Sequence, residues 1–108
     1  MAQFDVFPNP DSAQESRIPF LLDVQSDWLG SLGTTVIVPL YDAAASLTAN
    51  VHPVRGLMPI LEVEGQPAVM MTPEMAGIPR NRLPDKLASL TTERGAILAA
   101  LDILVTGV

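Results

Sequence analysis

Residues 20–40 read FLLDVQSDWLGSLGTTVIVPL, and this stretch decides the fold. Two apolar runs, at residues 20–24 and 34–40, flank a polar connection that contains glycine, which predicts two strands joined by a long hairpin loop. Since both runs are nearly continuous in apolar residues, we expect central strands covered on both faces. The connection carries Trp28, the only tryptophan, beside Leu29. An apolar pair at a loop tip is unusual, because such tips are normally polar.

The chain has the size of one small domain, and residues 1–108 are interpreted as a single domain. A chain of this length buries a little under ~70% of its unfolded surface, which is enough for one core. It has no cysteine, so disulfides and thiolate nucleophiles are excluded, and a reducing compartment fits. The net charge is −6 and the six basic residues are scattered. Direct duplex binding is not expected, because it needs clustered Lys and Arg to neutralise phosphates.

Neither a signal peptide nor a membrane span is expected from the sequence. The N-terminus, MAQFDVFPNPD, has no basic segment and no long apolar core. The longest apolar run, residues 96–105, is interrupted by Asp102 and is too short to cross a bilayer. We therefore expect a cytoplasmic, soluble protein without a membrane partner. The hydrophobic content of 48% is high for so small a domain, which indicates that part of the apolar surface lies in an interface between protomers.

Short strands are expected around the central pair, because ten prolines and seven glycines interrupt the chain. Pro39 is expected to end the second central strand, since proline cannot donate to a sheet ladder. Residues 41–56 fit either a helical turn or a loop. The other strands are predicted at residues 3–7 as an edge strand, at 58–63 and 67–72 as a hairpin around Gly65, and at 75–78 as a closing strand.

The last segment is predicted as a helix. Apolar side chains from Leu87 to Val108 recur at i, i+3, i+4 and i+7 and form one stripe. Ser89 or Thr91 is expected to cap the N-terminus of this helix through its hydroxyl. Gly107 fits a left-handed stop at the C-terminus, which leaves Val108 as a free apolar end.

The sequence lacks the residue patterns that carry most enzyme chemistry. It has no phosphate-binding glycine loop, no nucleophile elbow and no zinc-protease motif. His52 is the only histidine, so a metal site or a Ser-His-Asp triad is not expected. Asp23, Asp27 and Asp42 lie near one another in sequence, but solvated loop charges are the commoner case. Residue chemistry therefore favours a binding protein without cofactor or metal over an enzyme.

Five stretches of the sequence share their order and spacing with one known family. They are QFDVF at 3–7, LDVQSD at 22–27, VIVPL at 36–40, MMTPEMAGIP at 70–79, and the terminal helix with its end at Gly107 and Val108. In these stretches the chain resembles the CcdB family of bacterial toxins along nearly its whole length. The LDVQSD and VIVPL pair is the most specific part, because the polar run between them has little structural reason to recur.

The resemblance implies a mainly β fold: a small, partly open SH3-like barrel of antiparallel strands, an accessory small sheet and one C-terminal α-helix. It implies a homodimer whose two-fold axis brings both helices and tails together. It also implies a toxin that binds the A subunit of DNA gyrase and traps the enzyme on cleaved DNA without being an enzyme itself. A partly disordered, CcdA-like antitoxin would neutralise it and, in complex with it, repress their operon, so that DNA is a partner only indirectly.

Carried over by position, the resemblance assigns gyrase contacts in two places. Trp28 and Leu29 come from the loop after LDVQSD, and the helix end supplies Asp102, Thr106, Gly107 and Val108. The best-known family members have a tryptophan in the tail, whereas this chain has none there. We expect Trp28 to supply, from the loop, the aromatic anchor that the tail lacks, and to act together with the tail. The alternative is that Trp28 packs against the dimer partner.

Two other functions fit the same fold. The endoribonuclease toxins of the MazF/Kid type share this barrel, but they need basic and acid–base residues on the barrel face, and six scattered basic residues with one histidine argue against RNA cleavage. A non-toxic relative that retains only antitoxin binding is the third possibility, since the tail departs from the family pattern.

Overall fold

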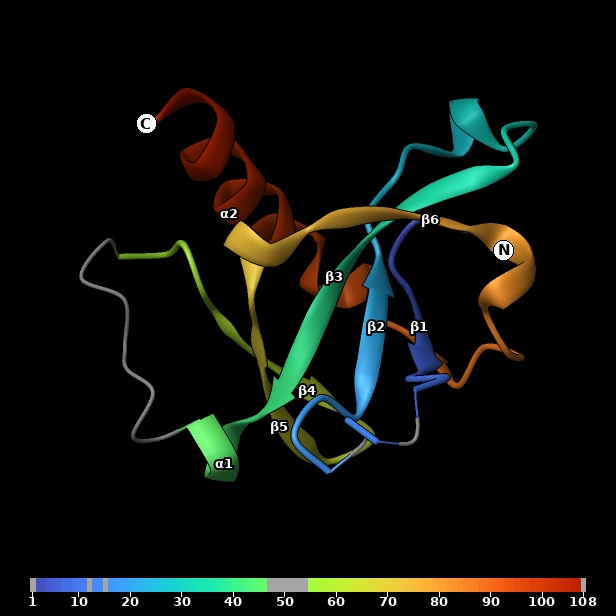
Figure 1. Cartoon of the computed structure of the whole chain (residues 1–108). Coiled ribbons are helices and arrows are strands. Elements are labelled where there is room, and N and C mark those ends of the chain that lie inside the picture. The colour runs from blue at the N-terminus through green and yellow to red at the C-terminus, as the bar shows by residue number, and fades with distance from the viewer. Residues whose placement is uncertain (1, 12, 15, 47–54, 108) are drawn as a thin grey trace.

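Seven strands form one curled antiparallel sheet in the computed structural model, which describes residues 2–11, 13–14, 16–46 and 55–107 (Figure 1). The mainly β fold with a C-terminal helix is confirmed. The strands are β1 (Asp5–Pro8), β2 (Phe20–Asp23), β3 (Thr34–Asp42), β4 (Ile60–Val63), β5 (Gln66–Met70), β6 (Ala76–Pro79) and β7 (Ala88–Ser89). The helices are α1 (Ala43–Ser46) and α2 (Arg94–Thr106), with 3-10 turns η1 (Asp27–Leu29), η2 (Thr72–Glu74), η3 (Arg80–Arg82) and η4 (Thr91–Glu93).

The longest strand, β3, lies at the centre of the sheet. One of its edges pairs with β2 in the predicted hairpin. Its other edge pairs first with β6, from Thr34 to Ile37, and then with β5, from Leu40 to Asp42. The sheet order is therefore β4-β5-β3-β2-β1-β7, with β6 as a branch. The sequence predicts a barrel with a small accessory sheet. In the structure, the accessory part is the branch that β6 adds to the curled sheet.

The core lies around the central hairpin and one face of α2. All four residues of β2 are buried, and Val38 and Leu40 of β3 are fully buried. Helix α2 adds Ile97 and Ala100 to the same apolar cluster. The prediction that the central strands are covered on both faces is thus confirmed, and burial of this apolar surface is the main stabilising term.

The prediction that Pro39 ends a strand is wrong, because β3 continues through Pro39 to Asp42. The Pro39 carbonyl accepts a hydrogen bond from the Met71 amide at 3.0 Å, just past the end of β5. In a strand, the N–H and C=O of one residue point to the same edge. The missing N–H of Pro39 therefore faces Met71, whose carbonyl accepts a hydrogen bond from the Glu74 amide at 3.0 Å instead.

The first strand is not the edge that the sequence predicts. β1 pairs with β2 on one side and with β7 on the other, where Asp5 lies opposite Ser89 and Val6 opposite Ala88. The Leu87 amide also donates to the Val6 carbonyl at 2.7 Å. The polar connection after β6 thus returns to cover the edge of β1, which a local sequence pattern does not reveal.

The C-terminal helix is confirmed, but its start is later and its cap differs. Helix α2 begins at Arg94, and its N-cap residue Glu93 makes no side-chain capping bond. Ser89 belongs to β7, and its hydroxyl lies 2.8 Å from that of Thr91, so neither caps the helix as predicted. Gly107 forms the predicted left-handed end, with φ +76°. No helix within the described residues is long and apolar enough to cross a bilayer.

The second hairpin and the closing strand are confirmed. β4 and β5 are joined by Glu64 and Gly65, which have φ of +50° and +82°. Positive φ at both central residues is typical of the tight type I′ hairpin turn. In residues 41–56 the structure forms the helical turn α1, whereas His52 lies outside the described residues.

Exchanging two glycines for alanine should change stability in opposite directions. Gly65→Ala should lower the free energy of unfolding by about 1 kcal/mol, because an added Cβ meets no atom but must adopt a left-handed backbone. Gly95→Ala, equally unobstructed but in α2, should raise it by about 0.5 kcal/mol. Urea denaturation at one protein concentration measures both. Equal stability of Gly65→Ala and the unsubstituted chain would contradict the turn assignment.

Candidate functional site

The connection between β2 and β3, residues 25–33, is here called the Trp28 loop. Its 3-10 turn η1 begins after Ser26, whose hydroxyl oxygen accepts a hydrogen bond from the Trp28 amide at 3.2 Å. The Ser26 carbonyl accepts from the Leu29 amide at 3.0 Å, and the Asp27 carbonyl accepts from Gly30 at 3.1 Å. Serine at this position satisfies an otherwise unpaired amide, which explains why a turn forms here.

The Trp28 loop presents an exposed apolar surface. The Trp28 side chain is 95% exposed, and Leu29 and Leu32 are 45% and 46% exposed. Of these, Leu32 was not predicted as a site residue, although an apolar side chain in a polar, glycine-containing loop is the same signal that identified Trp28. Neighbouring exposed apolar side chains of this kind are typical of a protein-binding surface.

Hydrogen bonds from two distant segments hold the Trp28 loop. The Arg80 guanidinium donates from Nε to the Leu32 carbonyl at 2.7 Å and from Nη2 to the Leu29 carbonyl at 3.3 Å. From the N-terminal segment, the Gln3 amide donates to Oδ1 of Asp27 at 2.7 Å. Asp27 is thus a structural acceptor in this loop. Arg80 carries no local sequence signal for this role, because it lies 48 residues from Leu32.

The buried carboxyl of Asp23 lies where the Trp28 loop joins β2 and β3. Asp23 is 2% exposed, and its Oδ1 accepts hydrogen bonds from the Thr35 hydroxyl at 2.8 Å and the Gln25 amide at 3.0 Å. Burial raises the pKa of the Asp23 carboxyl above its usual 3.8, and these hydrogen bonds and the charge of Arg80 oppose that rise only in part. This carboxyl serves to tie the two central strands together beneath the loop.

The second group of predicted site residues lies at the end of α2. Asp102 and Thr106 are exposed, and the Thr106 hydroxyl donates to the Asp102 carbonyl at 2.6 Å, one turn back. The Gly107 amide donates to the Ile103 carbonyl at 2.9 Å and ends the helix. Val105, which was not predicted as a site residue, is 76% exposed beside them. Val108 lies outside the described residues.

One chain does not bring the two groups together. In Figure 1 the Trp28 loop lies at the upper right of the molecule and the end of α2 lies apart from it at the upper left. Trp28 is exposed, as an anchor must be, but it is remote from the helix end within a single chain. Each chain therefore offers two separate apolar surfaces, and any joint action with the tail would have to involve a second copy or a partner that spans both.

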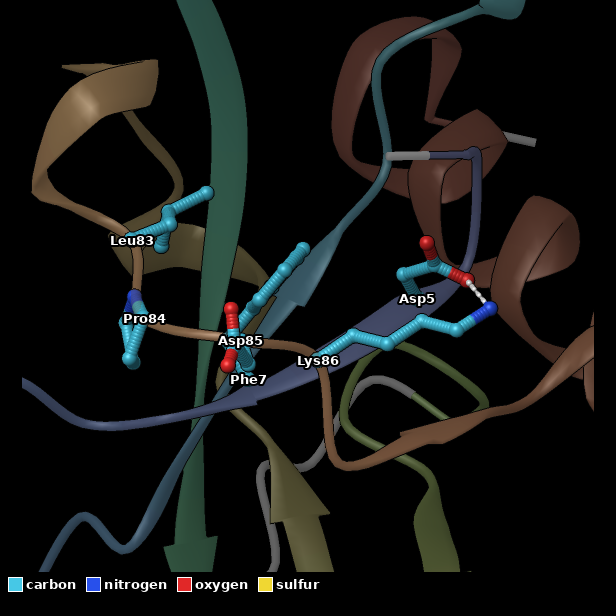
Figure 2. Close-up of a pocket in the computed structure, with 6 residues that line it drawn as sticks. All are labelled: Asp5, Phe7, Leu83, Pro84, Asp85 and Lys86. Carbon is cyan, nitrogen blue, oxygen red and sulfur yellow. Dashed lines mark ion pairs between the residues drawn. The ribbon is translucent and has the colours of Figure 1, made fainter.

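A shallow pocket lies elsewhere, between β1 and the segment before β7 (Figure 2). Lys86, which is exposed, forms an ion pair with the buried Asp5 across it, with Nζ 3.6 Å from Oδ1. The other oxygen of Asp5 accepts from the Ala2 amide at 2.8 Å. The remaining lining residues are Phe7, Leu83, Pro84 and Asp85, so the pocket contains none of the predicted site residues. Its charged pair holds the segment before β7 against β1.

Comparison with known families gives a match over nearly the whole chain. The family model described as CcdB protein matches residues 3–107 of the 108-residue chain. The matched residues include the Trp28 loop, Arg80 and all of α2. Both apolar surfaces described above therefore lie within the part of the chain that the family model matches.

The buried carboxyl predicts a pH dependence of stability. Because folding raises the pKa of Asp23, the folded chain binds more protons than the unfolded chain at pH values above 3.8. The stabilisation that this proton provides is complete below that pH and is lost as the pH rises through the folded-state pKa. The free energy of unfolding should therefore fall, relative to that of Asp23→Asn, as the pH rises above 3.8 and through the folded-state pKa of Asp23. Urea denaturation of both chains measures it, and a constant difference would refute the prediction.

Proposed function

Because the chain belongs to the CcdB family, which supports the role of toxin in a toxin–antitoxin pair, we propose that it binds the A subunit of DNA gyrase and traps the enzyme on cleaved DNA. On this proposal it acts as a poison and not as a catalyst. Its acidic net charge of −6 is compatible with this action, because the contact would be with the gyrase protein and not with its DNA.

The observation that carries the proposal is the nearly complete exposure of Trp28 on a loop that hydrogen bonds hold in place. Large aromatic side chains dominate the binding energy of many interfaces when the partner buries them. Trp28 is 95% exposed and contributes nothing to the core, so its packing inside this chain does not explain its presence. Leu29 and Leu32 beside it supply further apolar contact surface.

We further propose that the helix end belongs to the same function through a homodimer and a CcdA-like antitoxin. Val105 and Leu104 are 76% and 37% exposed at the end of α2, and Asp102, Thr106 and Gly107 are exposed next to them. A two-fold axis near this end would double the contacts that one tail makes. The antitoxin would neutralise the toxin by covering the same apolar surfaces, and DNA would be contacted only through the antitoxin or gyrase.

A cleavage assay tests the function. The purified chain is incubated with gyrase, ATP and supercoiled plasmid, and linear DNA trapped after detergent treatment is measured on a gel. An ATP-dependent increase in linear DNA is expected. RNA degradation without trapped DNA would favour the endoribonuclease alternative, and the absence of both activities would favour a non-toxic relative that binds only the antitoxin.

Trp28→Ala should weaken binding to the gyrase A protein by about 30-fold, which corresponds to about 2 kcal/mol, because it removes the aromatic anchor. Calorimetry or surface plasmon resonance measures the affinity. Ile60→Ala is the matched control, since Ile60 is 65% exposed but lies on β4, away from both surfaces. The Trp28→Ala chain should unfold at the same urea concentration as the unsubstituted chain. Unchanged affinity in the folded variant would show that Trp28 is not the anchor.

A further inference from the structure

The Trp28 loop has no buried side chain to fix its shape. Every residue from 27 to 33 is exposed, and η1 contributes none to the core. An exposed loop without apolar packing normally opens easily, because little free energy opposes its local motion. The contacts that define the conformation of this loop must therefore be polar.

Arg80 provides the most extensive of these polar contacts. Its side chain donates to the carbonyls of Leu32 and Leu29, at 2.7 and 3.3 Å. Its own amide donates to the Gly33 carbonyl at 2.9 Å. The Leu32 amide donates back to the Leu29 carbonyl at 3.1 Å, so the guanidinium binds both ends of one tight turn. A single residue thus fixes the second half of the loop, directly after Trp28.

The sheet also holds Arg80 in position. Arg80 follows β6, whose last residue, Pro79, is paired with Thr34 at the start of β3. The planar guanidinium carries its donors in a fixed fork, so it loses little conformational freedom when it binds two carbonyls. Arg80 therefore links the loop, which has no apolar packing of its own, to the ordered β3–β6 pair.

We propose that Arg80 is a positioning residue that holds the Trp28 loop in the conformation in which Trp28 binds its protein partner. The inference rests on the proposed function, which makes that partner the A subunit of gyrase. A loop that is already ordered does not lose conformational entropy on binding, so its affinity is higher than that of a flexible loop with the same side chains. Arg80 would raise the affinity without needing to touch gyrase.

Arg80→Met in the full chain tests the proposal, because the methionine side chain keeps an apolar stem but donates no hydrogen bond. Hydrogen exchange of the Leu29, Gly30 and Leu32 amides should become roughly tenfold faster, whereas exchange in β5 should not change. The affinity for the gyrase A protein should fall by roughly tenfold. Arg80→Lys keeps the charge but not the fork, and it should show both effects. Arg82→Met is the matched control, since Arg82 lies exposed on the same turn and bonds to no described residue of the loop.

Three outcomes would overturn the proposal. Faster exchange in the loop with unchanged affinity would show that binding does not depend on the loop's order. Weaker binding with unchanged exchange, or normal behaviour of Arg80→Lys, would show that Arg80 acts through its charge or through direct contact. If the unsubstituted chain fails to bind gyrase, the proposed function fails, whereas exchange in the free protein still decides whether Arg80 holds the loop.

Discussion

The change of partner along one edge of β3 is the constraint on which the rest of the structure depends. The first half of that edge pairs with β6 and the second half with β5, and Pro39 lies where the two meet. Because β6 runs antiparallel to β3, it ends where β3 begins, beside the Trp28 loop. The residue that follows β6, Arg80, is delivered to the loop by this geometry and not by any local property of its own segment.

The core that stabilises the fold and the surface proposed for recognition lie in different parts of the molecule. The free energy of folding comes mainly from the buried hairpin and from Ile97 and Ala100 of α2. A surface that binds another protein must leave its apolar groups in water until the partner arrives, so it cannot use them to fix its own shape. Exposed hydrogen bonds each contribute only about 1 kcal/mol, but a few of them suffice to order a short loop.

The features that the sequence predicts correctly depend on near neighbours. Continuous apolar runs identify the central strands, and Gly65 and Gly107 mark the turn and helix end that need a left-handed backbone. The exposure of Trp28 follows from its polar surroundings. Pro39, the cover of β1 by β7 and the contact of Arg80 with the loop could not be predicted in this way, because each depends on which distant strand lies alongside.

Because Trp28 does not pack in the core, its position also determines what the intrinsic fluorescence of this protein can measure. Its single indole is surrounded by water in the folded chain and would remain so in the unfolded chain. Intrinsic emission should therefore change little on denaturation, and folding has to be followed by circular dichroism. A partner that covers the indole would instead shift the emission to shorter wavelength. The same exposure that makes the fluorophore a poor monitor of folding makes it a specific, label-free monitor of complex formation.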